Sequence, residues 1–198
     1  MAALQQQDMG RTPAAGFADS FPISPLIRIT LLTLYISLMA PLPVLAQVSD
    51  TPISPWLLTA GIMTGGLGLY GALAQRVYTD ASGIRVMYPV WSRWLLRGGW
   101  SLNWSDIVAL KPRTTGQGGL VYYFVSQDQQ AYLLPMRIAG FTRLVGQVQA
   151  QTGIDTEDVK PLAQPWMYGI LLLFTLMLGL VDIWTITTAL QTGMTFNP

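Results

Sequence analysis

Long runs of apolar residues divide the chain, and three of them are long enough to cross a membrane as helices. They cover residues 26–46, 55–74 and 166–190, and each holds at most one charged side chain. An α-helix rises about 1.5 Å per residue, so roughly 20 residues cross the ~30 Å hydrocarbon core of a bilayer. The pattern predicts three transmembrane helices, of which the first two form a hairpin within residues 26–75.

The end of the first run leaves a second interpretation open. The sequence VLA at residues 44–46, followed by Gln47, resembles a signal-peptidase site behind an apolar stretch. However, the region before it would be unusually long for a signal peptide, and Pro41 and Pro43 crowd the site. The link 47–54 also has the length of a tight turn between antiparallel helices. A retained helix is therefore favoured over a cleaved signal.

Between the second and third runs, the hydrophobic pattern changes to short stretches that are typical of β-strands. The predicted strands lie within residues 76–80, 84–90, 101–110, 119–127 and 130–135. From about residue 139 to residue 152, apolar residues recur every three or four positions, which predicts a helix with Gly153 as its C-terminal cap. Residues 76–155 therefore read as one small α+β domain.

The remaining segments are short and polar. Residues 1–23 are rich in small and polar residues without apolar periodicity, which predicts a disordered tail. Residues 156–165 form a charged linker that contains proline, and residues 191–198 form a short C-terminal tail.

The central segment carries a family resemblance. Its quoted features are a strand pair around a glycine turn, the motif Leu102-Asn-Trp-Ser-Asp-Ile107, and a final amphipathic helix that runs into Gln-Thr-Gly-Ile at residues 151–154. In this order they resemble the bacterial pleckstrin-homology-like (PH-like) domains that are appended to membrane helices. A helix pair followed by such a domain is also similar in layout to the thylakoid photosystem I assembly proteins, which lack a third span. The resemblance implies a curved antiparallel sheet closed by one C-terminal helix and used for binding rather than catalysis.

Composition narrows the classes of function. Only 11% of the residues are charged, against about 25% in ordinary soluble domains, and the net charge of +1 argues against a nucleic-acid binder. The chain has no cysteine and no histidine, which removes thiolate ligands and the commonest general base and metal ligand. Its ten carboxylates are scattered. We therefore expect no catalytic residue, no cofactor and no metal site.

Basic residues predict the orientation in the membrane. Two arginines lie at or before the start of the first run, nine Lys or Arg residues lie between the second and third runs, and none follows the third. Short loops rich in Lys and Arg stay on the cytoplasmic side. The N-terminus and the central domain are therefore expected on the cytoplasmic or stromal side of a bacterial inner membrane or thylakoid, with the C-terminus outside or in the lumen.

A cluster of tryptophan and arginine is the first candidate contact site. Trp91, Arg93, Trp94 and Arg97 alternate within seven residues. Indole rings suit the depth of lipid headgroups, and guanidinium groups pair with phosphate. The cluster is predicted to contact a membrane surface or a partner protein; the alternative is that such tryptophans pack in the sheet, which we expect for Trp104.

The segment 111–119 is a second candidate. Lys111 and Arg113 precede several glycines, so this loop could hold an anion with two cations and exposed backbone N–H groups. It matches no phosphate-loop motif. A plain hairpin loop is the favoured alternative.

The second apolar run contains a stripe of small residues. Gly61, Gly65, Gly68 and Ala72 recur every three or four positions, so another helix can approach closely along this face. Packing against a helix of the same chain is favoured over packing against a partner subunit.

Asp182 is the one charged residue inside the third run. Carboxylates within membranes are costly and often belong to ion paths. No cation lies at a matching depth in another run, so a place near the interface, close to Thr185 and Thr187, is favoured over proton transport.

Together these patterns predict a non-enzymatic integral membrane adaptor, an assembly or accessory factor for a larger membrane complex, of which a photosynthetic complex is one candidate. Its expected partners are membrane lipids and subunits of that complex, without nucleic acid. Two alternatives stay open: a small transporter or channel component and a lipid-sensing module. The sequence leaves the oligomeric state open.

Overall fold

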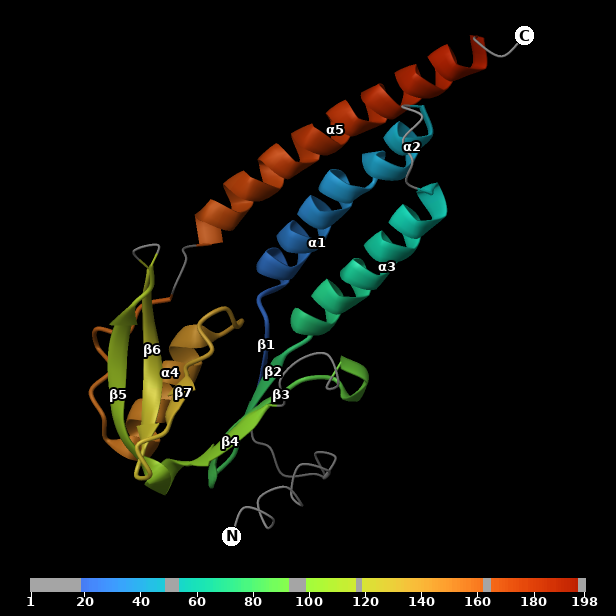
Figure 1. Cartoon of the computed structure of the whole chain (residues 1–198). Helices are drawn as coiled ribbons and strands as arrows, with labels where there is room; N and C mark the ends of the chain where they lie inside the picture. Colours follow the sequence, from blue (N-terminus) through green and yellow to red (C-terminus); the bar gives the residue numbers. More distant parts are fainter. Residues whose placement is uncertain (1–18, 49–53, 93–98, 117–118, 162–164, 196–198) are drawn as a thin grey trace.

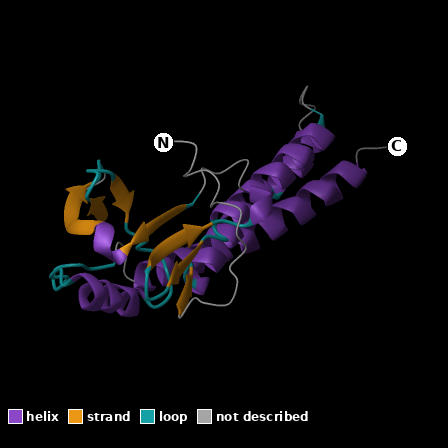
Figure 2. Cartoon of the chain, turned by 90° about the horizontal axis from the view of Figure 1, so that it is seen from below, coloured by secondary structure: helices purple, strands orange, loops and turns teal. Residues whose placement is uncertain are grey.

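The computed structural model describes residues 19–48, 54–92, 99–116, 119–161 and 165–195. They form a bundle of helices that extends from one end of a β-rich part (Figure 1). The same two parts are seen from below in Figure 2, where the helices again lie side by side and the strands gather at their base.

The bundle contains α1 (Pro25–Met39), α2 (Pro41–Val48), α3 (Pro55–Ala72) and α5 (Pro165–Thr195). Helices α1 and α5 run parallel. The Thr30 hydroxyl donates to the Tyr168 carbonyl and the Ser37 hydroxyl donates to the Thr175 carbonyl, both at 3.4 Å, so both helices advance in the same direction. Helix α3 runs antiparallel to α1 and returns the chain to the β-rich part (Figure 1).

The β-rich part contains two antiparallel sheets. The first has the order β1-β2-β3-β4, built from β1 (Asp19–Pro22), β2 (Arg76–Thr79), β3 (Gly83–Met87) and β4 (Trp100–Asn103). The second has the order β5-β6-β7, built from β5 (Ile107–Thr114), β6 (Leu120–Ser126) and β7 (Ala131–Leu133). Two 3-10 turns, η1 (Val90–Ser92) and η2 (Trp104–Asp106), and the helix α4 (Phe141–Thr152) complete it.

One hydrophobic core joins both sheets to α4. Phe21 from β1, Phe124 from β6 and Leu144 from α4 are each at most 1% exposed and belong to the same cluster. Helix α4 presents its apolar positions at helical spacing, and Gly153 ends it in the left-handed conformation with φ of 70°. The predictions of this helix and of its glycine cap are therefore confirmed.

The predicted fold class is wrong in the domain. A single curved sheet closed by a helix, as in a PH-like domain, is not formed, because the predicted strand 101–110 is broken at η2 and the chain enters a second sheet there. The break follows from Trp104, whose ring is 6% exposed and whose indole N–H donates to the Asp80 carbonyl at 2.9 Å. Burying this ring turns the backbone out of the first sheet.

The predicted set of three transmembrane helices is also wrong. Within the described residues, two helical stretches are long and apolar enough to cross a membrane, Pro25–Gln47 and Pro165–Thr188. Helix α3, in which five of 18 residues are glycines, is not one of them. The first stretch is divided into α1 and α2 at Ala40, because Pro41 lacks the N–H that would continue the helix.

The tail predicted for residues 1–23 ends too late. Residues Asp19–Pro22 form β1, which pairs with β2 in the register Asp19↔Thr79 to Pro22↔Arg76. Proline is tolerated here because β1 lies at the sheet edge. The Pro22 carbonyl accepts from the Ala139 N–H at 2.8 Å, so this strand also joins the chain just before α4. Residues 1–18 lie outside the described residues.

Candidate functional site

The long helices present apolar side chains to the outside on most of their circumference. In the most apolar window of Pro165–Thr188, 6% of the residues are buried, and in that of Pro25–Gln47, 11%. The core helix of a water-soluble protein would be mostly buried instead. The largest exposed apolar side chains of α5 include Trp166, Leu173, Phe174, Leu176, Leu180, Ile183 and Trp184. This surface has the chemistry of one that faces hydrocarbon.

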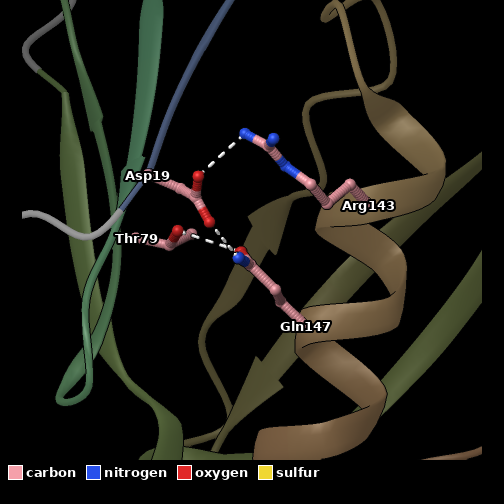
Figure 3. Close-up of polar contacts among 4 residues, drawn as sticks. All are labelled: Asp19, Thr79, Arg143 and Gln147. Atoms are coloured by element: carbon pink, nitrogen blue, oxygen red, sulfur yellow. Dashed lines mark hydrogen bonds and ion pairs between the residues drawn. The ribbon is translucent and has the colours of Figure 1, made fainter.

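An ion pair and side-chain hydrogen bonds join the first sheet to α4 (Figure 3). The Asp19 carboxylate forms an ion pair with Arg143 at 2.8 Å and also accepts from the Gln147 side-chain amide. The Gln147 carbonyl oxygen accepts from the Thr79 hydroxyl at 3.0 Å. Asp19 is not among the predicted site residues, because it lies within the segment 1–23 that the sequence pattern assigns to a disordered tail. The spacing of Phe21 and Ile23 at two residues, between Ser20 and Ser24, was the available signal for a strand.

The helices and the first sheet meet at a cleft of about 430 Å³. Its walls are formed by residues of both helices and of the sheet, among them Arg28 of α1, Tyr70 of α3, Arg76 of β2 and the segment from Met87 to Trp91. The Arg28 guanidinium carbon lies 4.7 Å from the centre of the Tyr70 ring, and this ring stacks on Trp91 at 6.2 Å with an angle of 17°. The cleft is thus lined by both cations and aromatic rings at the foot of the helices.

Two groups in the segments that flank β2 and β3 have shifted pKa values. Burial raises the pKa of Tyr88, which lines the cleft, so its phenol remains a neutral O–H donor. For Asp80, burial works against ionisation, but hydrogen bonds from Ser82 and from the Gly83 N–H outweigh it and lower the pKa. Asp80 accordingly holds the turn between β2 and β3, with its Oδ1 at 2.7 Å from the Ser82 N–H nitrogen.

Of the predicted tryptophan–arginine cluster, the structure describes Trp91. Its ring is 42% exposed and rests on α3, because Gly71 leaves space there: a Cβ at that position would lie 2.9 Å from both Trp91 and Ser92. Arg93, Trp94 and Arg97 lie outside the described residues. The contact of this cluster with a membrane or partner stays a prediction.

The predicted anion loop takes a different form. Lys111 and Arg113 stand on β5, opposite Tyr123 and Val121 of β6, and not in a loop. In the turn that follows, the Thr115 N–H donates to the Gly119 carbonyl, and the Gly119 N–H donates to the Thr115 hydroxyl. The backbone N–H groups of Thr115 and Gly119 therefore already donate within the turn, and they are not free to bind an anion as expected.

The small residues of α3 face different surroundings. Gly65 lies against the Tyr35 side chain of α1, whose hydroxyl donates to the Ile62 carbonyl at 2.6 Å. A Cβ at Gly61 would meet nothing within 4 Å, whereas Gly68 and Ala72 are half-buried. One part of the stripe thus packs within the chain, and the part at Gly61 stays open.

Asp182 lies in α5, half-buried, and its Oδ2 atom is covered without a hydrogen-bond partner among the described residues. The nearby Thr187 hydroxyl is engaged with carbonyls of its own helix. Within the described parts of the chain, no three metal-ligating side chains come together.

The chain is similar to the uncharacterized protein slr0269 of the cyanobacterium Synechocystis, with 56% identity over 162 residues that cover 81% of each chain. It matches no family model and no solved structure.

Proposed function

This chain belongs to the same family as the Synechocystis protein slr0269, and we propose that it is a non-enzymatic, membrane-anchored adaptor that serves as an assembly or accessory factor for a larger membrane complex. The long helices fix it in the bilayer, and the two-sheet domain binds a partner at the membrane surface.

The observation that carries the proposal is the exposed apolar surface of α5. Its large apolar side chains point outward along the helix, with exposed fractions of 60% at Trp166, 63% at Phe174 and 69% at Trp184. Water-soluble monomers rarely expose apolar patches of more than a few hundred Å². Hydrocarbon is the solvent that makes such a surface favourable.

The position of β1 supports a retained first helix. A cleavage after Ala46 would remove β1 together with α1, and with it Phe21, which is 1% exposed in the core of the domain. The same cut would remove the ion pair of Asp19 with Arg143 and its hydrogen bond with Gln147 (Figure 3). The domain would thus lose an edge strand and part of its core, which argues for a chain that keeps this segment.

The layout of the chain supports the proposed orientation. Strand β1 and the domain lie at one end of the helices, and α5 ends at the other (Figure 1). The Lys and Arg residues are concentrated in the domain, while the C-terminal tail has none. By the positive-inside rule the domain faces the cytoplasm or stroma.

The proposal is tested by purifying the full chain from its own membranes in mild detergent, with a tag at the C-terminus. We expect a fixed set of subunits of one membrane complex to co-purify in constant ratio. A homo-oligomer without other subunits would contradict the adaptor and favour a channel component. The observation that supports this alternative is the Oδ2 atom of Asp182, which has no hydrogen-bond partner among the described residues.

A further inference from the structure

The cleft at the foot of the helices has features that anchoring does not require. Arg28 and Arg76 line the same space, and no acidic residue is among its lining residues. In the part of the chain that the structure describes, no ion pair joins Arg28 or Arg76 to a carboxylate, so neither cleft arginine is neutralised in this way. Two like charges that share a cleft repel each other unless an anion lies between them.

The donors around these cations are suited to phosphate. Arginine presents a planar fork of N–H groups that binds phosphate oxygens in pairs, and its charge persists at any physiological pH. Tyr88 adds a neutral phenol to the same walls. Arg28 is held over the ring of Tyr70 at 4.7 Å, which orients the guanidinium before a ligand arrives.

The cleft also lies at the level where apolar helices end and polar strands begin. It is bounded by Leu73, Ala74 and Gln75, which follow the end of α3, and by the start of β2. Tyr70 and Trp91, both 42% exposed, stack beside it, and such rings favour the depth of lipid headgroups. Its volume of about 430 Å³ falls within the usual range of ~300–1,000 Å³ for small-molecule sites.

We propose that this cleft is a binding site for a phosphate-bearing anion, and that its occupant is the headgroup of an anionic phospholipid. Arg28 and Arg76 bind the phosphate oxygens, and the aromatic side chains of Tyr70, Tyr88 and Trp91 line the headgroup. A soluble phosphate would use the same cations. The inference rests on the proposed position in the membrane for the choice of a lipid over a soluble anion.

The test uses the purified full chain in nanodiscs made of phosphatidylcholine, with and without phosphatidylglycerol. Binding is read as the mole ratio of phosphatidylglycerol retained and as the shift in thermal unfolding. We expect Arg28→Gln and Arg76→Gln each to lower the affinity for phosphatidylglycerol about tenfold or more, because each removes a charge-assisted contact. Lys111→Gln is the matched control, since it removes one exposed cation from β5, away from the cleft lining.

The outcomes separate the possible sources. If the cleft variants lose phosphatidylglycerol while inorganic phosphate at millimolar concentration does not compete, the site is a headgroup site. If inorganic phosphate competes and protects the wild type alone, the anion site stands but the lipid assignment is overturned. Equal losses in Lys111→Gln and in the cleft variants would overturn the site itself, because charge anywhere on the surface would then be enough. Alkaline extraction of the same variants reports anchoring separately, so a failure of the proposed membrane position is distinguishable from a failure of the site.

Discussion

A single arginine in the middle of α5 distinguishes a helix that faces lipid from one that faces water. Leu176 lies at the centre of the Pro165–Thr188 stretch and is 53% exposed. Val108 on β5 is 51% exposed and serves as a matched control in the domain. Judged by exposure alone, Leu176→Arg and Val108→Arg should be equally harmless.

The two environments give very different magnitudes. An exposed substitution in water changes the free energy of unfolding by about 0.5 kcal/mol or less. At the centre of a membrane helix, arginine costs about 2.5–3.5 kcal/mol and the lost leucine a few tenths more, so the insertion of α5 should become ~3–4 kcal/mol less favourable. We therefore expect Leu176→Arg to shift the insertion equilibrium more than a hundredfold, since each 1.4 kcal/mol is about tenfold.

The assay must report the position of α5 itself, because the stretch Pro25–Gln47 can still hold the variant in a membrane. A tag at the C-terminus is followed by protease protection in sealed vesicles of known sidedness. Leu176→Arg should reduce the fraction of translocated tags, and Leu176→Arg combined with Leu180→Arg should reduce it further, whereas Val108→Arg should leave it unchanged. If all these variants translocate and fold like the wild type, the apolar face of α5 does not lie in lipid.

Three further predictions concern the folded chain. Trp104→Ala should lower the free energy of unfolding by ~3–5 kcal/mol, because it removes a buried ring and leaves the Asp80 backbone carbonyl without the indole donor. Denaturant titration of the detergent-solubilised protein measures this loss. A loss below about 1 kcal/mol would contradict the place of Trp104 in the core. Gly71→Leu should lower the melting temperature, because overpacking against Ser92 and Trp91 costs ~1–3 kcal/mol. Gly61→Leu in the same helix is the control and should leave the melting temperature unchanged, since a Cβ there meets nothing within 4 Å. Equal effects of the two substitutions would mean that the contact of η1 with α3 does not stabilise the fold. The pKa of Asp80 is lowered from 3.8, so the ionised carboxylate stabilises the fold above that pH, and this stabilisation is lost as the pH falls through the folded pKa. The difference in unfolding free energy between wild type and Asp80→Asn should therefore narrow below about pH 4. A difference that widens there would contradict the lowered pKa.

The local elements of the domain could be predicted from the sequence, because their patterns are local. The stretches 76–80, 84–90 and 119–127 correspond to β2, β3 and β6 within a few residues, and the period of three to four in residues 139–152 corresponds to α4. The glycine cap followed from one residue type at one position. Each of these signals needs only neighbouring side chains.

The pairing of the strands could not be predicted in the same way. Strand β1 has four residues, Asp-Ser-Phe-Pro, and it is a strand only because β2 lies beside it, 54 or more residues further along the chain. The division into two sheets depends on the burial of Trp104, which alternation within residues 101–110 does not reveal. The cleft was missed for the same reason, because Arg28, Arg76 and Tyr88 come together only when the hairpin of α1 and α3 closes on the sheet.

The connection between the helices and the domain bears on the adaptor role that we propose for this chain. The ion pair of Asp19 with Arg143 is partly exposed, with side-chain exposures of 28% and 61%, and such pairs contribute at most about 1 kcal/mol. Phe21 contributes more, since burying a large apolar side chain is worth ~1.5–3 kcal/mol, and β1 adds its ladder with β2. Strand β1 precedes α1 directly and β2 follows α3, and Trp91 of η1 packs against Gly71 of α3, so a tilt of the hairpin against the domain would break this packing. In the adaptor proposed above, a partner bound to the domain would therefore be held at a fixed angle to the membrane, which suits the positioning of a subunit during assembly better than a flexible tether would.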